Sequence, residues 1–515
     1  MKKYAYLIVV MAVVIGASTA VSLHWHRNDK PAEPGKEAQA INPQKGVRLN
    51  CPDCNIIMIS LSNVAAEHMS LYGYGRITTP NIDKWAKDAF VFEKAFTQAS
   101  WTLPVGTSLF TSLYPFTHKV TTRFVDNVLD PKIKTLPEIL KENGYSTAAF
   151  TGGLDYSSKF NHMRGFDSVD EAAKSSAAIY FAGFSESLAK ADSWIESQPK
   201  KKFFAFIHGY DAHCPFNPPK EFKGVFSDST KKNAELNTTE CLRGYANSED
   251  GTYTAYYYRK GSEQKVTLAK EDITYLEGLY DEEILSVDGL VSGFLNGLSP
   301  KVRDKTIVVI FSDHGEMFAK HGRFGRAGTV RGTHYNDVLH IPLMISIPGN
   351  AGERIKGLVQ TIDIMPTVLK SLGIKNSQGM QGRDLAGLIS SGKEVNKYVF
   401  AGSKYGWMQG PISAAYFKKR TINESVGTTD WKLIHEEDYD KDLKPVSESY
   451  ELYNLKDDPD ELKNLIDAEP ARAEELKNAL VAWKDGADSF DVKNVSSEGL
   501  LPPEVVEEAK KRGYW

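Results

Sequence analysis

The chain has 515 residues, of which 41% are hydrophobic, and a formal net charge of −4. A chain of this length and composition can bury a large core. Its near-neutral charge gives no overall bias toward nucleic acid, and one large domain with a smaller one is the expected organisation.

The amino terminus differs from the rest of the chain. Two lysines precede an apolar run at residues 6–15, and the small residues up to Ala20 suit cleavage by a signal peptidase. The run is short for a bilayer span, so we predict that residues 1–22 are a signal peptide, with a membrane anchor as the alternative. Residues 23–50 are predicted to be a flexible linker. We therefore expect the folded part outside the cytoplasm, in the periplasm or secreted, and possible membrane attachment only through the N-terminal segment.

The chain has four cysteines. No second Cys-x-x-Cys motif is present to complete a four-cysteine zinc site, and an oxidising compartment favours two disulfides. We prefer the pairs Cys51 with Cys54 and Cys214 with Cys241, because each closes a local loop. The other connectivities remain open at this point.

Two apolar runs are predicted to be buried parallel strands. The first spans residues 55–61 and is followed by Asn63. The second begins at Ile307 and delivers Asp313 and His314 at its carboxyl end, where open α/β sheets bind their ligands. An Asp-His pair offers a divalent cation one oxygen and one nitrogen ligand. The alternative is an ordinary strand-end turn.

Several helices are predicted between and after these strands. A polar turn around Thr102 leads into small and hydroxyl residues, which would open a helix whose amino end attracts anions. The alternative role for Thr102 is an ordinary N-cap. Amphipathic helices are predicted at residues 132–143 and 271–294, and another helix at Pro80, with Thr79 as its cap.

A short strand at residues 203–207 is followed by two histidines and an acid, His208, Asp211 and His213. Such a cluster can bind an oxyanion, shuttle a proton or ligate a metal, and the alternative is a polar turn capped by Asp211. The polar segment 228–267 is predicted to be an insertion with a hairpin near Tyr253, lying over the mouth of the site.

Motifs in a fixed order along the chain resemble the sulfatase family, within the alkaline phosphatase superfamily, from about Asn55 to the carboxyl terminus. One motif alone would be weak evidence, whereas their joint order and spacing carry the resemblance. They are Asn55-Ile-Ile-Met-Ile-Ser, Tyr72-Gly-Tyr, Thr79-Pro-Asn-Ile-Asp, Thr102-Leu-Pro, His208 to Pro219, Ser312-Asp-His-Gly-Glu, His340-Ile-Pro-Leu, Asp363-Ile-Met-Pro-Thr, Met380-Gln-Gly-Arg, Trp431-Lys-Leu-Ile and Glu451-Leu-Tyr-Asn-Leu-Lys-Asp-Asp-Pro.

The resemblance implies an α/β fold with a large, mostly parallel sheet flanked by helices, at residues 51–398. It also implies a smaller C-terminal α+β domain at residues 399–515, with a short antiparallel sheet packed against a helix that spans residues 470–484.

The chain departs from the family pattern at the first strand and at the nucleophile. Ser62 and Asn63 stand where sulfatases have acids that bind calcium, which removes up to two formal charges. The family motif Cys or Ser, any residue, Pro, Ser, Arg is here Thr102-Leu-Pro-Val-Gly106. Threonine is not expected to be oxidised to formylglycine, and the missing arginine removes the usual electrostatic partner of the nucleophile.

Carried over residue by residue, the resemblance implies a site with one divalent metal ion, calcium, zinc or manganese, weakly bound or absent. The equivalent of the family's basic sulfate-binding residue is either Arg331 or His334. The predicted site residues are Thr102 and His213 as catalytic groups, Asp313, His314 and Asn63 as metal ligands, and His208, Asp211, Arg331 and His334 as substrate-binding groups.

The resemblance alone implies hydrolysis of sulfate esters, with an anionic partner that is a sulfated glycan, lipid or small molecule, and no nucleic acid. One alternative is a Thr102-dependent phosphoester hydrolase or transferase, as in the superfamily's phosphoethanolamine transferases and lipoteichoic acid synthases, where a metal lowers the pKa of the threonine hydroxyl. A second alternative is a pseudoenzyme that binds an anionic ligand without turnover. A third, a structural envelope protein, would leave the histidines unexplained.

Overall fold

The computed structural model describes residues 47–122, 128–170, 183–198, 202–228, 233, 236, 241–247, 252–259, 262–325, 334–376, 378–405, 420–440 and 442–493. The predicted signal or anchor segment, most of the linker, and Arg331 lie outside the described residues. The described residues all belong to one compact unit, Gln44–Trp515. Within these ranges, none of the helices has the length and apolar character needed to cross a bilayer.

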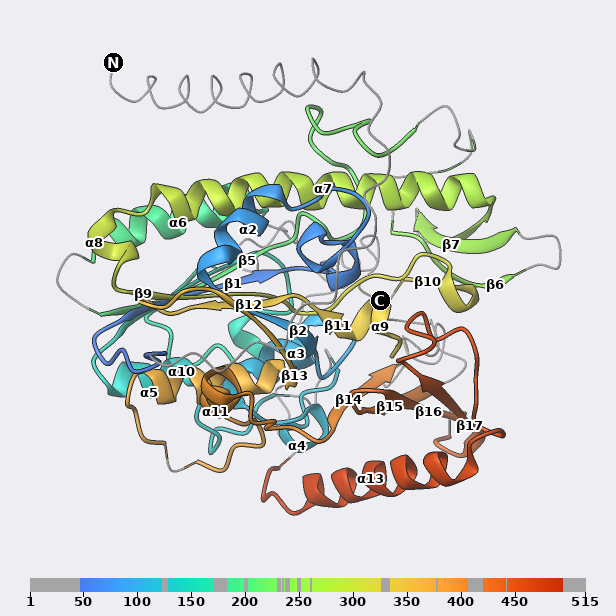
Figure 1. Cartoon of the computed structure of the whole chain (residues 1–515). Coiled ribbons are helices and arrows are strands. Elements are labelled where there is room, and N and C mark those ends of the chain that lie inside the picture. Colours follow the sequence, from blue (N-terminus) through green and yellow to red (C-terminus); the bar gives the residue numbers. More distant parts are fainter. Residues whose placement is uncertain are drawn as a thin grey trace. The chain divides into compact units, whose positions relative to one another are not determined.

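The largest sheet contains nine of the described strands, in the order β11-β2-β12-β9-β1-β5-β3-β4, with β13 paired to β2 (Figure 1). Strands β1, β5, β9, β3 and β4 are mutually parallel, as predicted, and β12 and β11 run antiparallel to their neighbours. The strands are β1 Asn55–Leu61, β2 Phe90–Phe96, β3 Ser146–Thr151, β4 Ser168–Asp170, β5 Phe203–Gly209, β9 Thr306–Ser312, β11 His340–Ile341, β12 Leu343–Ser346 and β13 Glu353–Gln360.

Helices cover both faces of this sheet (Figure 1). Alternate residues of β1 point to opposite faces because the side chains of a strand alternate. Ile57 and Ile59 pack with α6 and α7, and Ile56 and Met58 pack with α3, α5 and α10. The helices are α2 Pro80–Trp85, α3 Thr102–Thr111, α4 Pro115–His118, α5 Leu136–Glu142, α6 Phe184–Glu196, α7 Lys270–Gly297, α8 Pro300–Arg303, α9 Asn336–Leu339, α10 Ile364–Ser371, α11 Ala386–Ser391 and α13 Pro470–Asp488.

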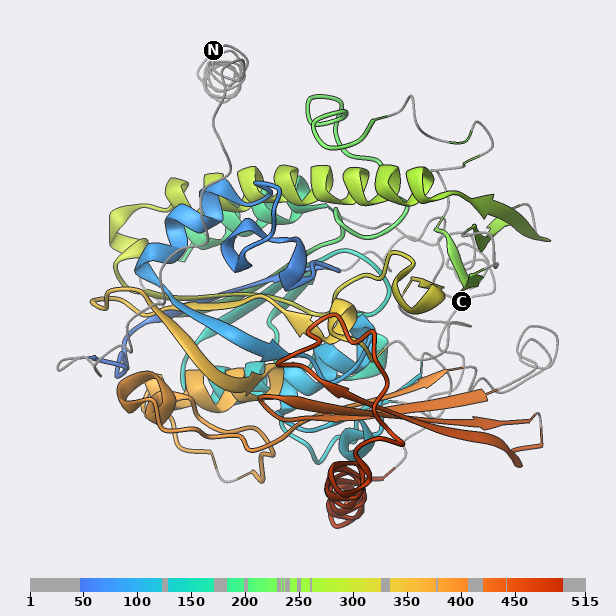
Figure 2. The same ribbon diagram turned by 45° about the vertical axis from the view of Figure 1, so that its right-hand side comes forward.

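A second sheet lies toward the carboxyl terminus and is antiparallel throughout, in the order β14-β15-β16-β17. Figure 2 shows α13 beneath it, seen nearly end-on. Val426, Leu433 and Leu452 from the strands form one apolar cluster with Leu476 and Leu480 of the helix. The strands are β14 Val399–Tyr405, β15 Arg420–Gly427, β16 Trp431–Tyr439 and β17 Pro445–Asn454. The fold is therefore the α/β sheet with an α+β C-terminal region that the sequence predicted, while a domain boundary at residue 399 stays a prediction.

The third sheet is built from three strands in the region of the predicted insertion and from β10, which lies outside it. It has the order β10-β6-β7-β8, and the predicted hairpin near Tyr253 is the β7–β8 pair. The strands are β6 Arg243–Asn247, β7 Tyr253–Arg259, β8 Ser262–Leu268 and β10 Arg323–Phe324. Both preferred disulfides are present, Cys51 with Cys54 and Cys214 with Cys241. The second one ties this insertion to the turn that follows β5.

Two local predictions need correction. The helix predicted at residues 132–143 begins only at Leu136, because Thr135 and Glu138 form a capping box that fixes its start. Thr79 precedes α2 but makes no side-chain cap hydrogen bond, since its hydroxyl donates to Asp83 within the helix instead.

Candidate active site

The candidate site lies at the carboxyl edge of the large sheet. Leu61 of β1 is paired with Ser312 of β9, so the residues that follow both strands meet at one point. The backbone N–H of Asn63 donates to Asp313 Oδ1 at 3.0 Å. Asn63 has a positive φ of 65°, a left-handed conformation that asparagine tolerates better than most residues. This turn holds the two side chains against each other.

The side chain of Asn63 is oriented by two further hydrogen bonds. Its Nδ2 donates to the carbonyl of Ala212 and to Glu316 Oε2, both at 3.0 Å. Its Oδ1 and Asp313 Oδ2 are buried and have no hydrogen-bond partner among the described residues. Because a buried polar atom without a partner costs free energy, these two oxygens are candidate ligand atoms for a bound cation.

His314 faces both Asp313 and Thr102. Its Nδ1 lies 3.0 Å from the Gly315 carbonyl, which can only accept, so Nδ1 carries the proton and Nε2 the lone pair. The distance from Nε2 is 3.4 Å to Thr102 Oγ1 and 3.5 Å to Asp313 Oδ2. The threonine hydroxyl can therefore donate to this nitrogen, while the carboxylate cannot.

Thr102 is the first residue of α3. Trp101 precedes it in an extended conformation at the N-cap position, so the hydroxyl of Thr102 does not act as an N-cap. All ten residues of the helix are buried, and Thr102 is only 2% exposed. Its hydroxyl lies at the positive end of the helix dipole, which favours negative charge on a ligand or on the oxygen itself.

These atoms fit a divalent cation chemically. Asn63 Oδ1, Asp313 Oδ2 and His314 Nε2 form a mixed set of one amide oxygen, one carboxylate oxygen and one imidazole nitrogen, and both oxygens lack other partners among the described residues. Such a set suits calcium, manganese or zinc. A single carboxylate in the set gives less charge than most cation sites have.

His208 lies next to this group on β5, fully buried. Its Nδ1 is 3.0 Å from Ser60 Oγ, and burial lowers its pKa to about 4, so the ring is neutral at pH 7. Its Nε2 has no hydrogen-bond partner among the described residues. His213 follows Ala212, whose carbonyl binds Asn63, and its Nδ1 contacts the carbonyl of Cys214. Both imidazoles thus flank the same edge.

The other predicted substrate-binding residues are arranged differently. Asp211 accepts a 2.7 Å hydrogen bond from the backbone N–H of Phe184 at the start of α6, and burial raises its pKa. His334 Nε2 is 3.0 Å from Ser403 Oγ, which also contacts Ser100, two residues before Thr102. Burial lowers the pKa of His334 well below 6.5. Arg331 lies outside the described residues, and all of these roles stay predictions.

Sequence reasoning did not single out Glu316 or Tyr156. Glu316 is three residues after Asp313 and only 3% exposed, and it fixes the amide of Asn63. Tyr156 follows β3 and is completely buried, with its ring 4.7 Å from that of His208. The only signal for Tyr156 was its position shortly after a strand that ends at the same edge.

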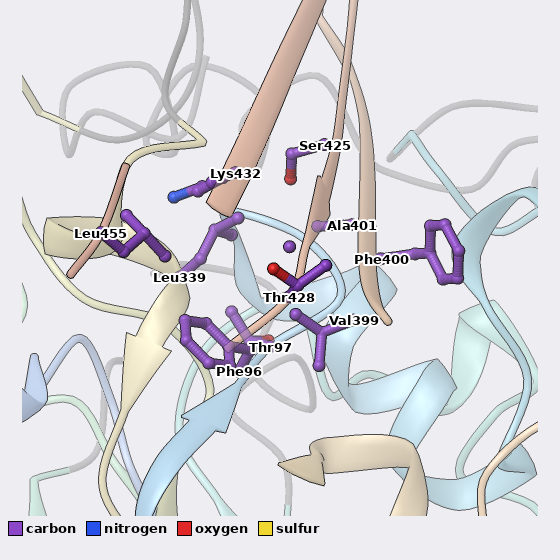
Figure 3. Close-up of a pocket in the computed structure, with 11 residues that line it drawn as sticks. Phe96, Thr97, Leu339, Val399, Phe400, Ala401, Ser425, Thr428, Lys432 and Leu455 are labelled. Atoms are coloured by element: carbon purple, nitrogen blue, oxygen red, sulfur yellow. The ribbon is translucent and has the colours of Figure 1, made fainter. Parts of the chain in front are cut away.

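A small pocket at the junction of the large and C-terminal sheets is separate from these residues (Figure 3). Its walls come mainly from β2, β14 and β15, and they are mostly apolar. Lys432 is the charged residue of the lining, and its amino group is already bound to Glu461 at 2.8 Å. This pocket therefore lacks the polar groups that an ester-cleaving site needs.

Comparison with known proteins agrees with the resemblance seen in the sequence. The family model described as Sulfatase matches residues 54–374, and one described as N-sulphoglucosamine sulphohydrolase, C-terminal, matches residues 330–484. Arylsulfatase K of Xenopus laevis is 22% identical over 459 residues, covering 84% of this chain and 82% of the relative. N-acetylglucosamine-6-O-sulfatase of Bacteroides thetaiotaomicron is 24% identical over 497 residues, covering 83% and 85%.

Solved structures share the fold. A protein solved in complex with its substrate D-glucosamine-2-N,6-O-disulfate superimposes with a TM-score of 0.63 at 18% identity, covering 85% of this chain and 99% of that one. A phosphonate monoester hydrolase of Agrobacterium radiobacter gives a TM-score of 0.62 at 17% identity, covering 84% and 96%. At these identities the likeness concerns the fold.

The parallel strands around β1, the polar edge and the antiparallel C-terminal sheet define an α/β protein of the alkaline phosphatase superfamily. The Sulfatase family model covers more than half of the chain. The chain belongs to the sulfatase family. Members of this family typically bind a divalent metal ion, and the relatives named above are sulfatases.

Proposed function

We propose that this protein hydrolyses a sulfate ester, with Thr102 as the nucleophile. The observation that carries the proposal is the 3.4 Å approach of Thr102 Oγ1 to His314 Nε2, beside the partnerless oxygens of Asn63 and Asp313. A hydroxyl at a helix amino end, next to an imidazole and a carboxylate, has the components needed to become a nucleophile.

In the proposed reaction, Thr102 Oγ1 attacks the sulfur atom. A new O–S bond forms while the bond from sulfur to the leaving alcohol breaks. We assign the proton transfer to His213, which would accept the hydroxyl proton and return a proton to the leaving oxygen, because the lone pair of His314 Nε2 would be used by the cation. Water then cleaves the sulfated threonine, which releases sulfate and restores the hydroxyl.

Asn63, Asp313 and His314 would hold one divalent cation, calcium, zinc or manganese. When bound, such an ion supplies positive charge that lowers the pKa of a nearby hydroxyl and neutralises the oxygens of the ester. The partnerless oxygens of Asn63 and Asp313 support this assignment. With one carboxylate in the set, we expect weaker binding than at a site with several acids.

The proposed substrate is an anionic ester on a sulfated glycan, since two of the compared proteins act on or bind sulfated glucosamine derivatives. His208, Arg331 and His334 would contact the substrate directly. Asp211 would act through the shape of the turn, because its carboxylate binds α6. We also propose an extracytoplasmic location, with cleavage or membrane attachment of the N-terminal segment.

Two alternatives have their own support. The shared fold of a phosphonate monoester hydrolase is compatible with a Thr102-dependent phosphoester reaction. Burial of the site residues supports a pseudoenzyme, because Thr102, His208 and Asp313 are at most 2% exposed. A ligand would have to open this edge before it could reach Thr102.

A three-substrate assay tests these proposals. Purified protein supplied with manganese would be assayed with 4-nitrophenyl sulfate, bis(4-nitrophenyl) phosphate and 6-O-sulfated N-acetylglucosamine. We expect the wild type to hydrolyse the sulfate esters and the Thr102→Ala variant to lose this activity. Thr107→Ala is the matched control, because its hydroxyl lies on the same buried helix but donates to the carbonyl of Leu103. Turnover that survives in Thr102→Ala removes this residue from the mechanism, and turnover of the diester alone favours the phosphoester reaction.

A further inference from the structure

Tyr156 and Gly106 compete for one volume at the candidate site. A Cβ atom placed on Gly106 would lie 2.6 Å from Tyr156 Cε1 and 3.2 Å from its hydroxyl oxygen. The first distance is far below normal van der Waals contact. A side chain at position 106 and the tyrosine at position 156 therefore exclude each other.

The identity of the glycine makes this exclusion informative. Gly106 is the last residue of the Thr102-Leu-Pro-Val-Gly motif, at the position where the resembled sulfatase motif has arginine. The phenol ring thus lies in a space beside the nucleophile position. This space is available to the ring only because residue 106 has no side chain.

The ring of Tyr156 is rigidly packed. Its centroid lies 5.0 Å from that of Phe206 and 4.7 Å from that of His208, and the residue is completely buried. Aromatic contacts of this kind fix a ring on two sides. The position of the hydroxyl is therefore set before any ligand arrives.

The phenol ring of Tyr156 lies beside His208 of the site, and its hydroxyl is close enough to Asp313 and Ser60 for both to affect its pKa. Burial and the charge of Asp313 raise its pKa well above 10, while the Ser60 hydroxyl acts in the opposite direction. The phenol is therefore un-ionised at neutral pH and can donate a hydrogen bond. The neighbouring His208 is also uncharged, so the donors on this side of the site are neutral.

We propose that Tyr156 is the anion-binding residue that takes over the position vacated at Gly106, donating its phenolic hydrogen to an oxygen of the bound sulfate ester. The choice of a sulfate ester as the ligand rests on the proposed function. The choice of Tyr156 as the binding residue rests on the Gly106–Tyr156 geometry. Unlike a guanidinium, a neutral phenol contributes a directed hydrogen bond and no charge. The anion binding that Tyr156 supplies should therefore depend only weakly on salt concentration.

Binding of inorganic sulfate tests this inference without requiring turnover. The full chain with manganese would be titrated with sulfate, and the rise in melting temperature would give an apparent affinity. We expect Tyr156→Phe, which removes only the hydroxyl, to weaken sulfate binding at least about tenfold. Tyr145→Phe is the matched control, because that tyrosine is also buried but donates to the carbonyl of Cys54. It should bind sulfate like the wild type.

A residue exchange provides the second test. Tyr156→Ala should lose sulfate binding, and adding Gly106→Arg to it should restore binding with a stronger dependence on salt, because an arginine would then fill the shared space. Gly106→Arg alone should fold poorly. If the double variant does not fold, the comparison of Tyr156→Phe with Tyr145→Phe still decides the inference.

The outcomes separate the inference from the proposed function. If turnover depends on Thr102 but Tyr156→Phe changes neither turnover nor sulfate affinity, the proposed function stands and the inference is overturned. Tyr156-dependent sulfate binding in a protein without turnover keeps the inference and overturns the function. A wild type that does not bind sulfate overturns the inference directly.

Discussion

The sheet edge and the junction between the two large sheets both bury charged groups but satisfy them differently. At the junction, Lys432 Nζ lies 2.8 Å from Glu461 Oε1 and 2.9 Å from Asn336 Oδ1, and the two charged side chains are 4% and 0% exposed. At the edge, Asn63 Oδ1 and Asp313 Oδ2 have no hydrogen-bond partner among the described residues.

Neighbouring Lys320 extends the paired network of the junction. Its amino group lies 3.0–3.1 Å from carboxylates of Glu67, Asp337 and Asp460. Glu67, an acid four residues after Asn63, is therefore used by this network. Buried charges that are paired hold elements together, whereas buried oxygens left without partners are better explained by a ligand.

The largest effect is expected for Asp313→Ala. This change should lower the affinity for a divalent cation by more than the roughly 10–100-fold typical of losing an outer-shell partner. In the absence of metal it should change the free energy of unfolding less than the control below, because the loss of the hydrogen bonds that Asp313 Oδ1 accepts from the backbone N–H groups of Asn63 and His314 is offset by the removal of the partnerless Oδ2. Elemental analysis and urea unfolding in a chelator measure the two effects.

The control for Asp313→Ala is Asp363→Ala. Asp363 is also completely buried, but its carboxylate accepts hydrogen bonds from the backbone of Gln360 and Arg383 and from Asn396. This variant should lose stability and keep its cation. If Asp313→Ala instead lost stability and the cation content did not change, the distinction between the two regions would be wrong.

The second effect in size is expected for Lys432→Ala at the junction. Removing one partner of a buried ion pair leaves Glu461 uncompensated and should cost about 3–5 kcal/mol. Lys134→Ala breaks an exposed pair with Glu142, in which the side chains are 51% and 55% exposed, and should change stability by less than about 1 kcal/mol. Equal losses in urea unfolding would contradict a structural role for the buried pair.

The sequence predicted the strands that build the edge because each is a continuous apolar run that stops at a polar residue. Strand β1 has the predicted bounds, and β9 ends at Ser312, directly before Asp313. The helix opening at Thr102 was also predicted, from its small and hydroxyl residues. Local pattern sufficed for these features because burial and turn chemistry act over a few residues.

Contacts between distant loops could not be predicted in the same way. Glu316 reaches Asn63 across 253 positions of the chain, and His334 contacts Ser403 of the C-terminal region. Tyr156 is defined by the space beside Gly106, which exists only once α3 and the loop after β3 have packed. Asp211 illustrates the reverse problem, because a helix-capping acid and a ligand-binding acid look alike in a sequence.

His162 provides a pH-dependent test of how much a buried group without hydrogen-bond partners lowers the stability of the folded protein. It is completely buried, both ring nitrogens lack hydrogen-bond partners among the described residues, and burial lowers its pKa to about 3. Below pH 6.5 the unfolded chain binds a proton that the folded protein does not. The wild type therefore loses stability as pH falls from about 6.5 toward 3, at up to about 1.4 kcal/mol per pH unit.

The variant His162→Phe should escape this loss. The difference in free energy of unfolding between the variant and the wild type should shift in favour of the variant by roughly 2 to 3 kcal/mol from pH 7 to pH 4.5. Urea unfolding at each pH measures this difference. Phe160→Leu changes an apolar neighbour and should show the same difference from the wild type at both pH values. A constant difference for His162→Phe would mean that the ring is protonated in the folded protein.

The smallest effect is expected where the two regions touch. Helix α9 carries Asp337 of the junction and also accepts a 2.8 Å hydrogen bond from the backbone of Gly315, the residue after His314. Lys320→Met should cost only about 1 kcal/mol, because the lysine is 34% exposed. Cation affinity should stay within about twofold, since the Gly315 hydrogen bond still holds the turn. A tenfold loss of cation affinity in the same titration would mean that the paired network positions the site, and the two regions would have to be treated as one.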